Sequence, residues 1–129
     1  MDINLCIGIK KRVNKCISEK DTASIASSGD LKVFSTPGMI AMMENASMNL
    51  VKDYLETEYT TVGIEVHIKH LSATPIGMEV WAEAKLIEVD NRRLVFQVKA
   101  WDEKDLIGEG IYERFIVQKD RFLARTQEK

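Results

Sequence analysis

The stretch FSTPGMIAMMENAS, residues 34–47, decides the fold because it begins the only long helix that the sequence predicts. Ser35 or Thr36 can cap the free N–H groups of a helix start, and Pro37 at the first helical position loses no hydrogen bond. Side chains suited to a core then recur at three- and four-residue steps and predict a helix of about 18 residues. Its predicted buried face consists of Ile40, Met43, Ser47, Leu50, Val51 and Tyr54. Glu44 lies on the border of this face, so its carboxylate either reaches water at the edge of the sheet or has a chemical role.

Alternating apolar and polar residues predict five strands around this helix. The first runs from Leu5 to about Val13, and the other four follow the helix. In these four strands the residues predicted to share one apolar face are Val62, Ile64, Val66 and Ile68, then Met78, Val80, Ala82, Ala84 and Leu86, then Leu94, Phe96, Val98 and Ala100, then Ile107, Ile111, Phe115 and Val117. Tight turns at Asp90 with Asn91 and at residues 102–105 predict an antiparallel meander. The single helix is the available cover for the apolar face, so the predicted class is α+β.

Two further segments lie outside these elements. Residues 14–33 are small and polar and predict a long connection with room for one helical turn, of the kind that often forms a lid. The tail KDRFLARTQEK, residues 119–129, is polar and is predicted to fray.

Length and composition exclude several classes of protein. A chain of 129 residues with 45% hydrophobic residues predicts one domain, residues 1–129, with a real core. Its 18 basic and 20 acidic residues are scattered, so no basic surface is predicted that would bind nucleic acid. No segment has the length of a membrane span or the pattern of a signal peptide, so a cytoplasmic protein is expected. Cys6 and Cys16 lack metal-binding spacing and are expected to be free thiols.

The second candidate for chemistry is His70, which continues the helix-facing side of its predicted strand. A histidine on such a face is most often structural, with its hydrogen bonds satisfied. Here, however, the helix offers a hydroxyl at its start and Glu44 two turns later, and these three groups are the parts of acid–base or nucleophilic hydrolysis. The N–H groups of Gly38 and Met39 at the helix start are candidates to stabilise an oxyanion.

Three segments of the chain carry a resemblance to a known family. The order of one strand, a long helix and four strands resembles the hotdog fold. FSTPGMIAMMENAS, TVGIEVHIKHLSATPIGMEV and LIGEGIYERFIV resemble the fluoroacetyl-CoA thioesterase branch of hotdog thioesterases. The likeness covers residues 34–118. It is specific in combination, because Thr-Pro, a Glu eight residues after that Thr, Val-Gly before the histidine strand, His followed by Ala-Thr-Pro, and a late Glu-Arg all occur in order.

The resemblance implies hydrolysis of an acyl-CoA thioester to the acid and free CoA. It implies His70 as general base, Glu44 as the carboxylate that orients or assists it, and Thr36 as nucleophile or as a positioner of water. Gly63 matches a glycine that lines the acyl pocket, and Arg114 matches an arginine close to it.

Other expectations concern the substrate and the assembly. Phe34, Gly38 and Met39 are candidates for contact with the substrate. No metal and no redox cofactor is expected, and CoA enters as part of the substrate. The resemblance also implies a homodimer or a dimer of dimers with active sites at the interface, which suits the unpaired edges of a five-stranded sheet.

The spacing of the candidates leaves their arrangement open. If residues 36–44 are all helical, Thr36 and Glu44 are separated by roughly 12 Å along the helix axis. Either the start of the helix is unwound, or His70 contacts one partner at a time, or two protomers share a site.

The acyl group also stays open. In the fluoroacetyl enzyme that the chain resembles, the connection before the helix carries aromatic lid residues. Residues 14–33 contain no aromatic residue, so fluoroacetyl selectivity is not predicted. The alternative function is a non-catalytic hotdog domain that binds acyl-CoA or another small molecule.

Overall fold

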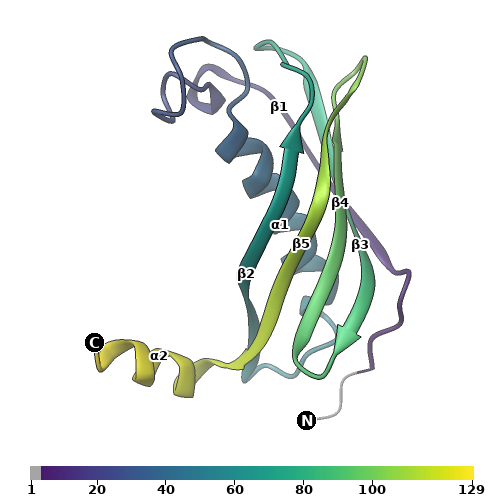
Figure 1. Ribbon diagram of the computed structural model, residues 1–129, viewed down its shortest axis with the longest axis vertical. Helices are drawn as coiled ribbons and strands as arrows, with labels where there is room; N and C mark the ends of the chain where they lie inside the picture. Colours follow the sequence, from purple (N-terminus) through teal and green to yellow (C-terminus); the bar gives the residue numbers. More distant parts are fainter. Residues whose placement is uncertain (1–3) are drawn as a thin grey trace.

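The computed structural model describes residues 4–129 and consists of a five-stranded antiparallel sheet with a long helix packed on one face (Figure 1). The strands are β1 (Lys10–Cys16), β2 (Tyr59–His70), β3 (Glu79–Asp90), β4 (Arg93–Trp101) and β5 (Leu106–Gln118). The helical elements are the 3-10 turn η1 (Glu19–Asp21), the long helix α1 (Thr36–Lys52) and α2 (Lys119–Gln127). The predicted α+β class, with one long helix against five strands, is confirmed.

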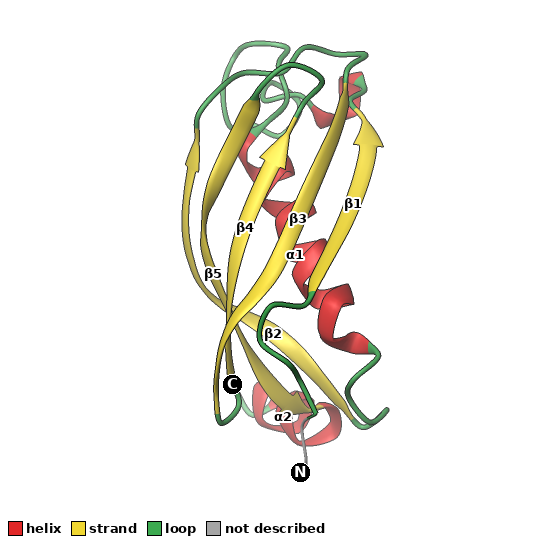
Figure 2. Ribbon diagram, turned by 90° about the vertical axis from the view of Figure 1, so that its right-hand side faces the viewer, coloured by secondary structure: helices red, strands yellow, loops and turns green. Residues whose placement is uncertain are grey.

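The core lies between α1 and the concave face of the sheet, and Figure 2 shows the strands curving around the helix. The helix buries a broad stripe at helical spacing, formed by Met39, Met42, Met43, Ala46, Ser47, Leu50 and Val51. Of the predicted face, Ile40 is only half-buried and Tyr54 lies beyond the helix with 47% exposure, so these two predictions were wrong. From β3 and β4 the predicted inward residues are fully buried, namely Val80, Ala82, Ala84, Leu86, Leu94, Phe96, Val98 and Ala100. In residues 4–129 no helix is long and apolar enough to cross a membrane.

The order of the strands differs from the predicted meander in one respect. The sheet has the order β1-β3-β4-β5-β2, so β3, β4 and β5 form a meander while β2 pairs with β5. The prediction that all four later strands follow one another in the sheet was therefore wrong. Because β2 crosses over to the far side, it becomes an edge strand that is open on one side.

The first strand begins later than predicted. It covers Lys10–Cys16 rather than the segment from Leu5 to about Val13. Gly8 has a φ of 101°, which interrupts an extended backbone before the strand can start. Leu5 and Ile9 still pack against the core, so their alternation reflected burial rather than strand structure.

A β-bulge changes which residues of β2 face the helix. The pairing with β5 shifts between Gly63 and Glu65, so Ile64 is the extra residue. Val66 pairs with the buried Tyr112 on the inner face, as predicted. Before the bulge the alternation of inward and outward side chains is reversed. Gly63 and Thr61 face inward there, and the prediction that Val62 does so was wrong.

The face predicted for β5 was also wrong in part. Ile107 is fully buried, but Ile111 and Phe115 are exposed by 38% and 37%. The inward residues of the strand are Tyr112, Arg114 and Ile116, all buried.

The polar tail forms a helix instead of fraying. Gln118 caps α2 by accepting a hydrogen bond from the N–H of Arg121 through its side chain. In Figure 1 this helix projects from the end of β5 that lies opposite the N-terminus of α1. It buries none of its residues in the chain.

Candidate active site

Two adjacent hydroxyls at the start of α1 have different tasks. Ser35 is the N-cap, and its Oγ accepts a hydrogen bond from the N–H of Gly38 at 3.0 Å. Pro37 follows in the first turn, where its missing N–H costs nothing. Since Ser35 satisfies the helix end, the hydroxyl of Thr36 is available for another contact.

That contact is with His70, at the end of β2. Thr36 Oγ1 lies 2.7 Å from His70 Nδ1, which is hydrogen-bond distance for nucleophile and base. Burial lowers the pKa of the His70 imidazole, so the ring is neutral near pH 7 and can accept a proton. The other nitrogen, Nε2, is buried and has no hydrogen-bond partner among the described residues. Thr36 and His70 therefore place a base beside a hydroxyl, and the Nε2 atom of the imidazole still lacks a hydrogen-bond partner within residues 4–129.

The pair opens into a pocket of about 320 Å³. The pocket is lined by Ala23, Ser28, Val33, Phe34, Thr36, His70, Leu71, Ser72 and Ala73. Much of its wall is thus the long connection before α1, at the position predicted for a lid. The pairing of Val33 with Pro75 and the hydrogen bond from Phe34 N–H to the Thr74 carbonyl fix this wall to the loop after β2.

Glu44 belongs to a second cluster further along α1. Its Oε2 accepts a hydrogen bond from the hydroxyl of Tyr112. Arg114 donates to the same hydroxyl at 2.5 Å, and its Nη1 lies 3.8 Å from Glu44 Oε2. Arg114 also donates to Thr61, to Oγ1 and to the carbonyl oxygen, both at 2.7 Å. These bonds leave a buried guanidinium well satisfied beside a carboxylate that is 42% exposed.

Gly63 lies directly against this cluster. A Cβ at position 63 would be 2.5 Å from the hydroxyl oxygen of Tyr112 and 3.0 Å from Glu44 Oε2. Any side chain here would displace the polar atoms that it meets. The bulge places Gly63 on this face, so the glycine and the bulge together provide the room in which Glu44 and Tyr112 meet.

The structure therefore brings the predicted residues together in two groups. Thr36 and His70 form one, whereas Glu44, Arg114 and Gly63 form the other with Tyr112 as an unpredicted member. Because α1 begins at Thr36, the expectation of an unwound segment between Thr36 and Glu44 is excluded.

The prediction that the N–H groups of Gly38 and Met39 stabilise an oxyanion was wrong. The N–H of Gly38 donates to Ser35 Oγ, and the N–H of Met39 donates to the Ser35 carbonyl at 3.0 Å. Both groups serve the cap and the first helical turn, so neither is free to bind an oxyanion. The Met39 side chain is fully buried and packs over Gly108, the residue paired with His70. Phe34 lines the pocket although it is only 1% exposed.

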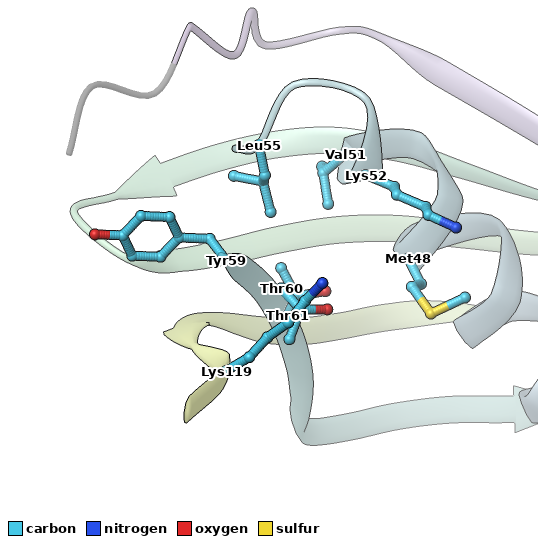
Figure 3. Close-up of a pocket in the computed structure, with 8 residues that line it drawn as sticks. All are labelled: Met48, Val51, Lys52, Leu55, Tyr59, Thr60, Thr61 and Lys119. Carbon is cyan, nitrogen blue, oxygen red and sulfur yellow. The ribbon is translucent and has the colours of Figure 1, made fainter. Parts of the chain in front are cut away.

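A second pocket, of about 240 Å³, lies at the C-terminal end of α1 (Figure 3). It is lined by Met48, Val51, Lys52, Leu55, Tyr59, Thr60, Thr61 and Lys119. Thr61 links it to the cluster, because Thr61 accepts two of the Arg114 hydrogen bonds. Val51 and Leu55 point into this pocket in Figure 3, and α1 also contributes Lys52 to its wall.

Removing the N-cap is expected to destabilise the protein without removing a catalytic group. Ser35→Ala leaves the Gly38 N–H without its acceptor in a buried position, and such substitutions cost about 1 kcal/mol in the free energy of unfolding. Urea unfolding of the variant beside the wild type measures this change. An unchanged free energy of unfolding would show that Ser35 does not stabilise the helix start.

Comparisons with known proteins agree with this geometry. The family model of fluoroacetyl-CoA-specific thioesterases matches residues 17–120. A fluoroacetyl-CoA thioesterase of Streptantibioticus cattleyicolor is 36% identical over 98 residues, which cover 76% of this chain and 70% of that enzyme. A solved structure of a fluoroacetyl-CoA thioesterase superposes with a TM-score of 0.93 at 28% identity, over 98% of both chains. A hot-dog-like protein from Thermanaerovibrio acidaminovorans, 24% identical over 95% of this chain and 90% of its own, has a TM-score of 0.87 and shows the fold alone. The predicted hotdog fold is confirmed.

Proposed function

The chain belongs to the fluoroacetyl-CoA-specific thioesterase family, and on this premise we propose that it hydrolyses a small acyl-CoA thioester to the free acid and CoA. The observation that carries the proposal is the 2.7 Å contact between Thr36 Oγ1 and His70 Nδ1 at the wall of a pocket. A neutral imidazole in hydrogen-bond contact with a hydroxyl is the arrangement that general-base catalysis requires.

In the reaction, His70 takes a proton and an oxygen attacks the carbonyl carbon of the thioester. The attacking oxygen belongs either to Thr36, which gives an acyl ester that water then cleaves, or to a water molecule that Thr36 holds. In both cases the C–S bond breaks, and the CoA sulfur leaves with the proton returned by His70. We propose that the reaction requires no metal and no redox cofactor, because none of these steps uses one.

The test is release of free CoA from a panel of short, branched and aromatic acyl-CoAs. Turnover of any member supports the proposed hydrolysis, and the relative kcat/KM values give the acyl preference. The residues of the lid wall, Ala23, Ser28 and Val33, bring no aromatic ring to the pocket, so we propose a preference that differs from fluoroacetyl. Binding of acyl-CoA without any turnover would instead indicate the non-catalytic domain.

We propose that the active protein is a homodimer joined through β2. This strand is a sheet edge, and Ile64 and Val66 are exposed by 51% and 46% although they are large and apolar. Antiparallel pairing of two β2 strands would cover these side chains and satisfy the open backbone groups. It would also place the end of one β2, which carries His70, beside the half of the second β2 that carries Gly63.

This placement supports a site shared by two copies. Within one chain Glu44 is bonded to Tyr112, and His70 to Thr36, with Nε2 buried and unpartnered among the described residues. A carboxylate from the second copy would give that nitrogen the orienting partner that a catalytic histidine needs. We therefore propose that Glu44 of one copy serves Thr36 and His70 of the other.

A cytoplasmic location suits this function. Cys6 and Cys16 are both exposed and free, a state that persists in a reducing compartment. CoA thioesters are made and used in the same compartment, so we propose that the enzyme acts there.

The activity is expected to fall at acidic pH. His70 must be neutral to accept a proton, and burial moves its pKa below the ordinary value of about 6.5. The logarithm of kcat/KM should therefore rise with pH, pass an inflection below 6.5 and become level by about pH 7. Steady-state kinetics over this range, with the protein shown to stay folded, test the expectation. An inflection clearly above 6.5 would mean that another group supplies the base.

A further inference from the structure

The hydroxyl of Tyr112 has surroundings that core packing does not explain. Tyr112 is fully buried among apolar residues of the sheet, and its ring packs against Phe96 at a centroid distance of 6.4 Å. A phenylalanine would fill this space as well. The hydroxyl instead sits between two charged groups, as donor to Glu44 and acceptor from Arg114.

We infer that Tyr112 is a positioning residue of the hydrolysis proposed above: its hydroxyl fixes Glu44 Oε2 and so leaves the second carboxylate oxygen to orient the His70 imidazole of the other copy. The inference rests on that proposed function and adds a residue to it. Among the described residues, none forms a hydrogen bond to Glu44 Oε1, so that oxygen is left for the chemistry while Oε2 is held.

The hydroxyl is suited to this task because it stays protonated. Burial, together with the hydrogen bond to Glu44, raises the pKa of Tyr112 to about 12. Arg114 supplies the second restraint, because its Nη1 donates to the hydroxyl oxygen and thereby leaves the hydroxyl proton for Glu44. Arg114 in turn is fixed by its two bonds to Thr61. The restraint thus runs from the backbone of β2 through Arg114 and Tyr112 to the carboxylate.

Gly63 gives a second, steric way to disturb the same contact. A methyl group at this position would lie 2.5 Å from the Tyr112 hydroxyl, but 3.4 Å from the ring carbon that bears it. In the wild type, Gly63→Ala must push the hydroxyl away from Glu44. In a Tyr112→Phe background the hydroxyl is already gone, so most of that steric effect should disappear.

The experiment compares Tyr112→Phe, Gly63→Ala and the double variant, with acyl-CoA hydrolysis and thermal unfolding measured for each. Tyr112→Phe is expected to lower kcat about 10- to 100-fold while KM changes less than about twofold, because the carboxylate is misplaced but the substrate still binds. The double variant should be no slower than the slower single variant, since both changes break one contact. Tyr54→Phe is the matched control, because Tyr54 lies beyond α1 with 47% exposure and its loss of a hydroxyl should leave kcat unchanged.

The outcomes are distinguishable. Full kcat in a folded Tyr112→Phe protein, or losses that multiply in the double variant, would overturn the inference while leaving the hydrolase intact. A loss of kcat explained by a matching loss of folded protein would overturn it as well, since Tyr112 would then be only structural. Absence of turnover by the wild type would overturn the proposed function, and the inference with it.

Discussion

His70→Ala is expected to lower kcat for acyl-CoA hydrolysis by a hundredfold or more. The imidazole is the group in contact with the Thr36 hydroxyl, and general-base catalysis contributes about 10²- to 10⁴-fold. Alanine cannot accept the proton, whereas the pocket and the rest of the cluster remain. CoA release measured at saturating substrate, on protein shown to be folded by circular dichroism, gives the change in kcat.

The chain offers a matched control in its other histidine. His67 lies on the outer face of β2, is exposed, and contacts Glu65 with Nε2 at 3.0 Å from Oε1. His67→Ala should therefore retain kcat within about twofold, as expected for a surface substitution. Equal losses in the two variants would mean that the effect comes from β2 and not from a base. Retained activity in His70→Ala would remove the Thr36 and His70 pair from the mechanism.

Mixing two inactive variants is expected to restore activity if two copies share each site. A heterodimer of His70→Ala and Glu44→Ala chains has one site that lacks both groups and one site that lacks neither. Random exchange makes about half of the dimers mixed, so about a quarter of the wild-type activity should return. Each variant alone should remain at least about a hundredfold below the wild type.

The measurement is CoA release after the two proteins have been unfolded together and refolded as a mixture. Sites built from a single chain would give no recovery, because every chain in the mixture lacks one essential group. A matched mixture of His70→Ala with Thr36→Ala is the control, since these residues contact each other within one chain and no site in that mixture is complete. Recovery in this control would contradict the assignment of Thr36 and His70 to the same copy.

The helix and the inner faces of β3 and β4 could be predicted because their burial follows a simple period. Seven residues of α1 are buried at helical spacing, and alternate residues of β3 and β4 are fully buried. The candidates Thr36, Glu44 and His70 were found for a related reason: polar groups interrupt or adjoin these apolar patterns. A resemblance to a family then gave them roles, together with Gly63 and Arg114.

The errors occurred where the period breaks or where a polar side chain is buried. The irregular pairing at Ile64 has a sequence signal in Gly63, because a glycine inside a strand often marks a bulge, but the change of face that follows from it was not predicted, so Val62 was misassigned. In β5 the alternation of isoleucine and phenylalanine pointed to the wrong face, because Arg114 and Tyr112 are buried through hydrogen bonds with each other and with Thr61. Hydrophobicity alone treats an arginine as exposed, so Tyr112 was missed with it. Tyr112 lies midway between Gly110 and Arg114, so the three residues share one face of the strand, and this spacing was the available sequence signal. Only the structure shows that this face is the inner one.

The bulge at Ile64 lets Gly63 and His70 share one face of β2 although their spacing in the sequence is odd. The segment before it presents Thr61 and Gly63 to the cluster, and the segment after it presents His70 to Thr36. Side-chain replacements at Ile64 keep this phase, because the side chain is 51% exposed and only the extra backbone unit sets it. Deletion of the same residue would leave Gly63 paired with Arg114 and Glu65 with Glu113, a regular ladder in which Gly63 and His70 still share a face, whereas deletion of a paired residue between them would turn one segment to the other face. Among natural or engineered relatives of this chain, the active ones should therefore vary freely in the identity of this residue, and those that lack it should have a regular strand.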